Sequence, residues 1–406
     1  MRVLMVTPGT RGDVAPMAGL ASRLRSHGHE VTIAANNAHA SLVSGAGCGF
    51  SGLPGDMGHL VSPAEPGTRA AAADLRRYMR ELGDYMELAA QGTLAAAGKG
   101  TDVILANAVA PYAYDVGEAL GIPVLGAHLQ PVQASTAYPP VTLGLARSLG
   151  PVANRTLGAI LSRSKAPYDA PAAGLRRTLG LPPMSRASAE HRRRKANSPI
   201  LHGISPAVLP RPRDWHPGLS LAGYWWPLAE PTWQPSAELA GFLADGPAPV
   251  YIGFGSTAAM DADFMVDVAR RAGVRAVLQG VDGVSDSNVI SVGTIPHAWL
   301  FPRVSAVVHH AGAGTTAAGL RAGVPSVGVP VFTDQPFWAA RVAALGAGPA
   351  PIPYKKLTPQ RLADSIKQAV ETDGFAREAK HVASLLAAED STAPVLDALR
   401  TAVPHA

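Results

Sequence analysis

The stretch His309-His310-Ala311-Gly312-Ala313-Gly314-Thr315-Thr316 decides how the rest of the sequence is interpreted. It follows the apolar run 306–308, a predicted strand, and leads into 317–321, which is helical in pattern. Glycines allow close backbone approach, and threonines at a helix start can cap it. The free N–H groups and the positive end of the helix dipole then form an anion site, to which a neighbouring histidine adds a hydrogen bond. A plain structural turn fits the same residues.

Both halves of the 406-residue chain alternate short β-branched runs with helical patterns. This alternation predicts α/β domains, each with a parallel sheet wrapped by helices, and the length suits two of them. The strands are expected at 3–6, 31–33, 102–105 and 122–125, and then at 250–252, 276–278, 289–291, 306–308 and 326–329.

Residues 206–235 separate the two halves, because they hold seven prolines and four of the six tryptophans. Such proline density predicts an extended linker with little regular structure. We therefore expect domains at 1–205 and 236–406, with the final helix packing back on the first domain. The carboxyl ends of both sheets should border one cleft. Segment 57–100 is Ala-rich and helical in pattern, whereas 130–200 shows no clear periodicity and stays open between loops and helices.

Composition excludes several classes of protein. The net charge of +5 is modest, and Lys and Arg are scattered apart from the run 192–195, which fits a solvated loop or a transient contact with a membrane surface or phosphate. No basic stripe interleaved with aromatics indicates nucleic acid. Cys48 is the only cysteine, so neither a disulfide nor a Cys-based metal site is expected. No signal peptide or membrane-spanning stretch is evident, which predicts a cytoplasmic protein.

Two further motifs follow the glycine-rich segment: Gly323-Val324-Pro325 and Asp334-Gln335-Pro336. The adjacent carboxylate and carboxamide suit several sugar hydroxyls at once. The three motifs together closely resemble the donor-binding signature of the GT-B glycosyltransferases, the superfamily of plant and macrolide glycosyltransferases. Other segments are most similar to its sterol glucosyltransferase branch. These are 9–16, 206–212, 223–225, 251–256, 296–301 and 335–338.

The resemblance implies a GT-B fold of two facing Rossmann-like domains and assigns the donor site. His310 and the backbone at Gly312, Gly314 and Thr315 would bind the diphosphate, with Ser256 nearby. Asp334 and Gln335 would hold the sugar hydroxyls, and the nucleobase would lie against the loop from Ile295 to Trp299. Ala311 departs from the family pattern, which usually has glycine, and a methyl there is tolerated unless the residue needs positive φ.

The resemblance also implies an inverting transfer, in which one base removes the acceptor hydroxyl proton as its oxygen attacks the anomeric carbon. Asp13 matches the carboxylate of the antibiotic and sterol branches. Alternatively, Asp13 caps a helix starting near Pro16 or pairs with Arg11. His128 is a second candidate for base or acceptor contact, and Gln130 for acceptor contact.

The expected activity is transfer of a hexose from UDP- or TDP-sugar to a hydroxyl of a lipophilic small molecule: a sterol, polyketide or macrolide-like product of secondary metabolism. No cofactor or metal is expected. The stretch Asp261-Ala262-Asp263 imitates a metal motif, but acids at a helix start explain it better. The alternatives are a GT-B sugar-nucleotide epimerase, a lipid-linked sugar transferase and a non-catalytic sugar-nucleotide-binding activator. A nicotinamide-dependent enzyme lacks its Gly-X-Gly-X-X-Gly turn here.

Overall fold

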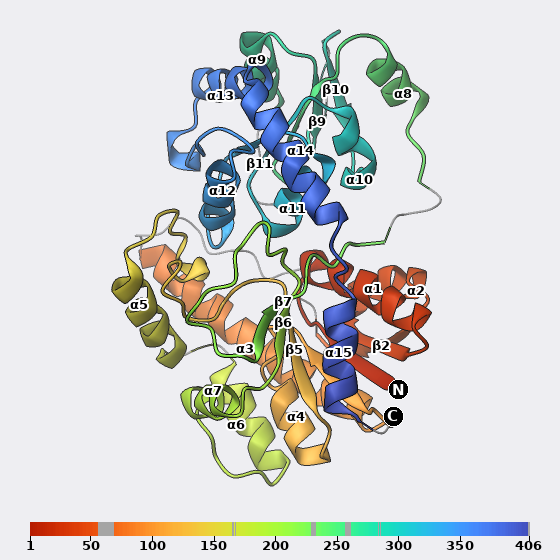
Figure 1. Cartoon of the computed structure of the whole chain (residues 1–406), viewed down its shortest axis with the longest axis vertical. Helices are drawn as coiled ribbons and strands as arrows, with labels where there is room; N and C mark the ends of the chain where they lie inside the picture. The colour runs from red at the N-terminus through yellow and green to blue at the C-terminus, as the bar shows by residue number, and fades with distance from the viewer. Residues whose placement is uncertain are drawn as a thin grey trace.

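The computed structural model describes residues 1–55, 69–164, 166, 168–228, 233–255, 261–282, 284 and 286–404. Two bodies, each built on a parallel sheet, lie one above the other (Figure 1). All predicted strands of both halves are present. Across the described residues, none of the helices combines the length and apolar character that crossing a bilayer requires.

The first sheet has seven strands in the order β3-β2-β1-β4-β5-β6-β7, and all neighbours pair in parallel. Its strands are β1 (Arg2–Val6), β2 (Glu30–Asn36), β3 (Gly49–Leu53), β4 (Val103–Ala106), β5 (Val124–His128), β6 (Ile200–His202) and β7 (Leu219–Leu221). The strand β7 lies inside the predicted linker, so that segment is partly regular and continues the first sheet.

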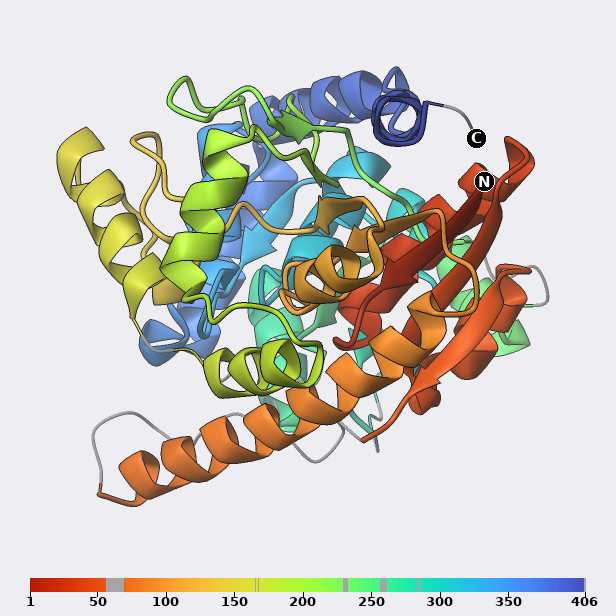
Figure 2. The same cartoon turned by 90° about the horizontal axis from the view of Figure 1, so that it is seen from below.

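Alternate residues of each central strand fill opposite faces of this sheet. Val3 and Met5 face the core made with α1 (Arg11–Ser26), while Leu4 and Val6 face the long helix α3 (Arg69–Ala97). Figure 2 shows α3 running along the outside of this sheet. The helix confirms the helical pattern expected within 57–100, of which residues 57–68 lie outside the described ranges.

The second sheet has five strands in the order β10-β9-β8-β11-β12. They are β8 (Val250–Gly253), β9 (Ala276–Gln279), β10 (Val289–Val292), β11 (Ala306–His309) and β12 (Ser326–Gly328). The helices that flank this sheet are α8 (Ala237–Ala244), α9 (Ala262–Ala272), α10 (His297–Leu300), α11 (Ala313–Ala322), α12 (Gln335–Ala344), α13 (Pro359–Glu371) and α14 (Asp373–Ala387). The last helix, α15 (Ala393–Ala402), instead packs Val395 and Leu399 into the core of the first sheet (Figure 1).

The unassigned stretch 130–200 is largely helical. It holds α5 (Pro151–Arg163), α6 (Asp169–Thr178) and α7 (Arg186–Lys195). The arginine run expected as a loop is the last turn of α7. Arg192 Nη2 lies 2.7 Å from Glu118 on α4 (Ala113–Leu120), and the Arg193 guanidinium lies 4.5 Å from the Tyr114 ring centroid. Two of its four charges therefore hold α7 against α4.

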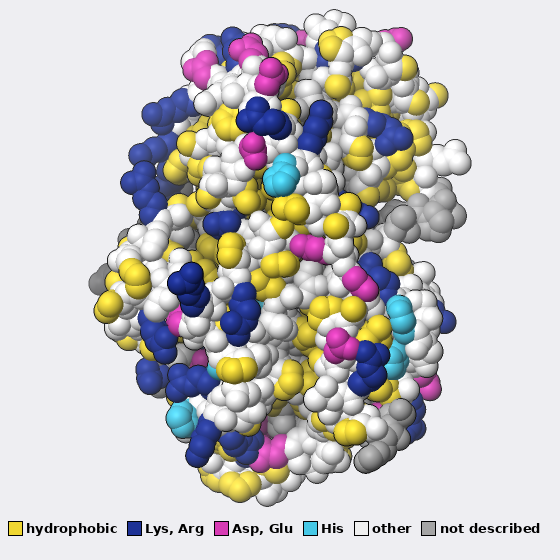
Figure 3. Space-filling model, in the orientation of Figure 1, with side chains coloured by type: hydrophobic (Ala, Val, Ile, Leu, Met, Phe, Trp, Pro, Cys, Tyr) yellow, Lys and Arg dark blue, Asp and Glu magenta, His cyan; other side chains and the backbone are white. Residues whose placement is uncertain are grey.

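An apolar cluster joins the two bodies. Tyr138 of the first body packs its ring against Phe337 of the second, with centroids 5.4 Å apart, and both belong to one buried cluster with Trp338. The guanidinium of Arg341 adds two hydrogen bonds to the carbonyl oxygen of Val208. On the face shown in Figure 3, Lys and Arg side chains are spread over both bodies with Asp and Glu among them.

Candidate active site between the two sheets

The carboxyl ends of the two sheets face one another. Gln130 follows β5 of the first sheet, and Asp334 follows β12 of the second. Their side chains meet across the boundary, with Gln130 Nε2 donating to Asp334 Oδ2 at 3.0 Å. In parallel α/β sheets this edge is where ligands bind.

Asp13 lies in the first turn of α1, which begins at Arg11 and not near Pro16. Its Oδ2 accepts hydrogen bonds from Thr10 N at 2.9 Å and from Thr10 Oγ1 at 3.3 Å, so it does cap this helix. Oδ1 has no partner among the described residues. Capping through Oδ2 therefore leaves Oδ1 available for the catalytic role that the family resemblance predicts.

Burial raises the pKa of Asp13, and hydrogen bonds from Thr10 oppose that rise. The charge of Asp334 raises the pKa further, and the nearby His39 lowers it. The Asp13 side chain remains half-buried. A carboxylate with a raised pKa is a better proton acceptor than an ordinary aspartate.

Gly9 allows Asp13 to reach this position. A Cβ added at Gly9 would lie 2.1 Å from Asp13 Oδ2. Sequence reasoning identified neither Gly9 nor His39 as site residues. Gly9 belongs to the segment 9–16 that carries the family resemblance, whereas His39 stands in no motif.

His310 lies between two glycine turns that follow the adjacent strands β8 and β11. A Cβ at Gly312 would lie 2.6 Å from His310 Nε2, and one at Gly255 would lie 3.5 Å from its Cε1. Burial lowers the pKa of His310, so the ring is neutral near pH 7 and donates through one nitrogen. Its Nδ1 is buried without a partner among the described residues.

The helix α11 starts directly after this histidine, with Gly312 as its N-cap residue. The amide of Thr316 is the first to bond back into the helix, to Gly312 O at 2.9 Å. The N–H groups of Ala313, Gly314 and Thr315 have no acceptor within the described ranges, and a Cβ at Gly314 would meet nothing within 4 Å. These groups form an open helix N-terminus next to His310, which suits an anion.

His309 has a structural role in the same turn. Its side chain is fully buried, and its Nδ1 accepts a hydrogen bond from Ala311 N at 3.0 Å. Burial lowers the pKa of His309 to about 3, so the ring stays neutral. Ser256, predicted beside the diphosphate, lies outside the described residues.

Asp334 and Gln335 start α12 and use their side chains differently. Asp334 Oδ2 accepts a hydrogen bond from Trp338 Nε1 at 2.9 Å, and its Oδ1 accepts one from Thr333 Oγ1 at 3.1 Å. Gln335 Oε1 accepts from the backbone N–H groups of Val331 and Phe332, at 2.8 and 3.2 Å. Asp334 thus offers acceptors, and Gln335 offers the donors of its amide nitrogen.

The predicted nucleobase residues fall into two environments. The Ile295 side chain is buried in the core of the second body, so only its backbone is available to a base. The half-buried Trp299 ring lies 4.9 Å from the Trp233 ring, and the Arg303 guanidinium lies 4.4 Å from its centroid. Within the described part of the chain, no hydrogen bond, ion pair or ring contact joins either residue to Asp13, His310 or Asp334.

His128, at the end of β5, belongs to a buried network. The amide of Gln133 lies between two rings: its Nε2 is 3.1 Å from His128 Nδ1, and its Oε1 is 2.8 Å from His202 Nε2. Burial lowers the pKa of His202 to about 4, and its Nδ1 lies 2.9 Å from Ser220 O.

The amide nitrogen of Gln133 donates to His128 Nδ1. Burial lowers the pKa of His128, so its ring is neutral and carries its proton on Nε2, which can donate to an acceptor hydroxyl.

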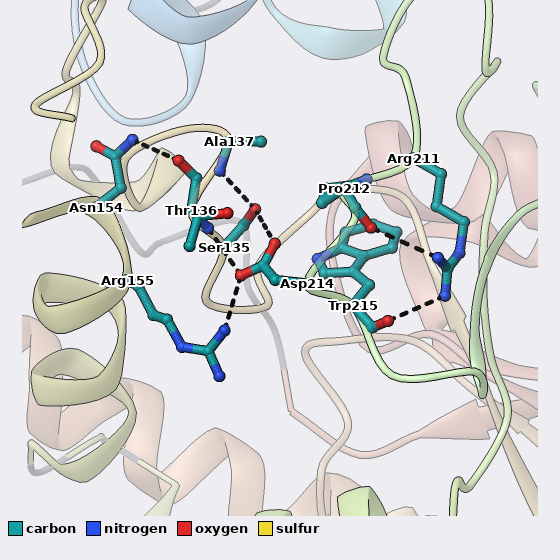
Figure 4. Close-up of polar contacts among 9 residues, drawn as sticks. All are labelled: Ser135, Thr136, Ala137, Asn154, Arg155, Arg211, Pro212, Asp214 and Trp215. Carbon is teal, nitrogen blue, oxygen red and sulfur yellow. Dashed lines mark hydrogen bonds and ion pairs between the residues drawn. The ribbon is translucent and has the colours of Figure 1, made fainter. Parts of the chain in front are cut away.

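Asp214 holds the loop after β5, which carries Gln133. Its carboxylate accepts hydrogen bonds from Ser135 Oγ, Thr136 N and Arg155 Nη1, at 3.1, 2.9 and 3.2 Å (Figure 4). The adjacent Trp215 stacks on the His202 ring with centroids 4.6 Å apart. Sequence reasoning missed these contacts, because Asp214 lies about 80 residues from the loop that it holds.

The described residues bring no three His, Cys, Asp or Glu side chains together as a metal-binding group. The imitation metal motif is a helix start, as predicted: Asp261 is the N-cap of α9 and accepts a hydrogen bond from Asp263 N at 3.2 Å. Independence from metal remains a prediction.

Family models and relatives cover nearly the whole chain. Residues 3–139 match the glycosyltransferase family 28 N-terminal domain, and residues 254–401 match the C-terminal domain of erythromycin biosynthesis protein CIII-like proteins. The O-mycaminosyltylonolide 6-deoxyallosyltransferase of Streptomyces fradiae is 36% identical over 96% of this chain and 94% of its own length. The sterol 3-beta-glucosyltransferase UGT80A2 of Arabidopsis thaliana is 32% identical over 100% of this chain, which spans 66% of that relative.

Solved structures show the same fold. Glycosyltransferase VinC in complex with dTDP matches with a TM-score of 0.72 at 22% identity, and the glycotransferase of kitacinnamycin matches with 0.73 at 20%. Each covers 99% of both chains. With two facing parallel-sheet bodies and relatives of this identity, the chain belongs to the family of GT-B glycosyltransferases that includes these macrolide and sterol enzymes, and it is a hexosyltransferase.

Proposed function

We propose that this enzyme transfers a hexose, with inversion, from UDP- or TDP-hexose to a hydroxyl of a lipophilic sterol, polyketide or macrolide-like acceptor in the cytoplasm. One observation carries the proposal: Gln130 of the first body donates a hydrogen bond to Asp334 of the second at the carboxyl ends of the two sheets, the edge at which Asp13 follows β1. This arrangement supports a base candidate of the first body acting near a sugar-binding carboxylate of the second.

In the proposed reaction, the acceptor oxygen attacks the anomeric carbon while Asp13 takes its proton. The bond from that carbon to the diphosphate breaks on the opposite face. The nucleoside diphosphate leaves against the open N–H groups of α11 and the His310 ring, which stabilise its charge. His128 Nε2–H would donate a hydrogen bond to the acceptor molecule, and the Ile295 backbone and Trp299 would border the nucleobase.

The names of the relatives support both donor types. One transfers 6-deoxyallose to a tylonolide derivative and another glucosylates sterols, while VinC was solved with dTDP. The proposal therefore keeps both nucleotides and commits to a lipophilic acceptor.

Asp13→Asn tests the proposal, because asparagine still accepts the Thr10 hydrogen bond but cannot take a proton. Transfer from UDP-glucose and TDP-glucose to a sterol and to a macrolactone is measured by mass spectrometry of the product. The variant should lose about 10²–10⁴-fold in turnover, the usual contribution of a general base. Its affinity for UDP and TDP, measured by calorimetry, should match that of wild type.

The pH dependence gives a second readout. A protonated Asp13 cannot accept a proton, so the rate should fall as the pH drops through the Asp13 pKa. Because burial raises that pKa, the fall should lie above the ordinary aspartate value of ~3.9 and be absent from the variant. Turnover of Asp13→Asn near the wild-type rate would show that another group is the base.

A further inference from the structure

Gln130 reaches from the first body into the predicted sugar site of the second. The sequence indicated it as an acceptor contact, because it follows β5 of the predicted acceptor domain. In the structure its side-chain partner is Asp334, 204 residues further along the chain. The position of Gln130 therefore points to the donor sugar as well as to the acceptor.

Asp334 accepts hydrogen bonds from one partner that is fixed in place and from another that a ligand could replace. Its Oδ2 accepts from both Gln130 and Trp338, which fills the two lone pairs of that oxygen. Trp338 is 1% exposed in the shared apolar cluster and cannot move away without disturbing it. Gln130 is half-buried and lies on a loop, so a sugar hydroxyl can take its place on Asp334 or bind beside it.

Gln130 also supplies what its two neighbours lack. Asp334 accepts in all of its hydrogen bonds to Gln130, Thr333 and Trp338. Gln335 has its oxygen occupied by two backbone amides. Gln130 retains one N–H and its amide oxygen, which has no partner among the described residues. A side chain that both donates and accepts can hold a hydroxyl that is at the same time bonded to Asp334.

The chain that follows Gln130 packs against the second body close to Asp334. A Cβ at Gly144 would lie 3.5 Å from Thr333 O, and the Tyr138 ring packs on Phe337. Asp214 holds the intervening residues 135 and 136. Gln130 is thus presented to the sugar from a fixed loop.

We propose that Gln130 is a specificity-determining residue for the donor sugar: it binds, together with Asp334, one hydroxyl of the hexose and favours donors that carry it. This inference rests on the proposed function, in which Asp334 binds the sugar. It gives the first body a direct part in donor selection.

Calorimetry with Gln130→Ala tests the inference without any acceptor. The ligands are UDP, TDP, UDP-glucose, TDP-glucose and the 2-, 3-, 4- and 6-deoxy derivatives of the glucose donor that binds. Loss of a hydrogen bond to a hydroxyl shared with a carboxylate should weaken the sugar nucleotide about tenfold. UDP and TDP alone should bind within twofold of wild type, since they lack the sugar.

One deoxy derivative should bind wild type about tenfold more weakly than its parent and should be insensitive to Gln130→Ala. Gln130→Glu keeps the side-chain length but sets a carboxylate against Asp334, so it should weaken the sugar nucleotide more than alanine does. Gln368→Ala, an exposed glutamine on α13, is the matched control and should leave every affinity unchanged.

Two outcomes would overturn the inference. One is unchanged affinity of Gln130→Ala for the sugar nucleotide, and the other is an equal loss for all deoxy derivatives. A loss of UDP and TDP affinity in parallel would show that Gln130 only ties the two bodies together. If wild type itself bound neither sugar nucleotide, the proposed function would fail instead.

Discussion

Two residues of the donor side adopt a backbone conformation that favours glycine. Ala311 has φ of 62° and Thr333 has φ of 52°. The left-handed region costs an L-residue about 1–2 kcal/mol, and more for a β-branched side chain. Ala311 lies beside the predicted diphosphate ligand His310, and Thr333 lies beside Asp334, so strain is concentrated where the donor is expected.

Ala311 is thus at a position where its methyl group is costly, because the residue has positive φ. The family usually has glycine there, and the structure gives the reason, because the position needs positive φ. Its methyl is fully buried and lies near Gly328, which offsets part of the cost. The sequence could indicate the irregular position, but not the sign of φ, which depends on how β11 turns into α11.

Gly312 provides a test of the His310 position. Its φ of −62° suits alanine, so Gly312→Ala introduces no backbone strain. The new methyl would lie 2.6 Å from His310 Nε2 and must displace that ring. We expect about a tenfold or larger loss of affinity for UDP and TDP in calorimetry, the size of one hydrogen bond to a charged group.

Gly241→Ala on α8 is the control, because a methyl there meets no atom within 4 Å. Its affinities should match those of wild type, and its melting temperature should be equal or slightly higher, because alanine is the better helix former. If Gly312→Ala and Gly241→Ala bound UDP and TDP equally well, His310 would not be a ligand of the diphosphate.

Among the elements, the sequence predicted long and periodic ones well. The central strands 3–6 and 306–308 are continuous apolar runs, as strands buried on both faces should be. The strands β3, β6 and β7 were missed. The first contains two glycines, and the other two have three residues each, with β7 lying among prolines. The helix α7 was missed because none of its described side chains is buried, so it lacks an apolar face.

The segment that precedes β7 contains Asp214, which holds the loop after β5 in place through hydrogen bonds. Asp214 replaces three hydrogen bonds that residues of this loop and of α5 would otherwise make to water (Figure 4). Such a tether between elements distant in sequence cannot be deduced from local pattern. It explains why a proline-rich stretch belongs structurally to the first body.

Asp214→Ala should weaken the attachment of the loop after β5 to the segment before β7. The substitution removes a carboxylate that accepts hydrogen bonds from Ser135, Thr136 and Arg155. Only 14% of the Asp214 side chain is exposed. We expect a loss of about 1–3 kcal/mol in stability, the cost of leaving such groups unpaired. Hydrogen exchange should rise in residues 133–163 and stay unchanged in the second sheet.

Asp397→Ala removes an aspartate that is 69% exposed and pairs with Arg400, and it serves as the control. An exposed pair of this kind contributes little, so its melting temperature should stay near that of wild type. Unchanged exchange in residues 133–163 of Asp214→Ala would show that the loop is held by its other contacts.

For the molecule as a whole, the sequence predicted the two-body architecture but not how the bodies are connected. The order of domains followed from the alternating pattern and the family resemblance. The apolar cluster around Tyr138 and Trp338 and the hydrogen bond of Gln130 to Asp334 join residues about 200 positions apart. Pairings of this kind depend on three-dimensional packing and have no local signal.

The chain also crosses back to the first body at its end, and this crossing has a measurable consequence. Leu399 of α15 is fully buried in the core that contains Val3 and Met5, and Trp225 Nε1 donates to Ser391 O at 3.2 Å just before that helix. Leu399→Ala should therefore cost about 2–5 kcal/mol, as is usual for a buried leucine.

The loss should appear in the first sheet although the substitution lies near the C-terminus. Hydrogen exchange should accelerate in β1 and β2, while β8 and β11 keep their protection, because α15 packs on the first core alone. Leu385→Ala on α14, where the side chain is 41% exposed, is the matched control and should change the melting temperature little. Equal acceleration in both sheets after Leu399→Ala would mean that the two bodies unfold as one cooperative unit.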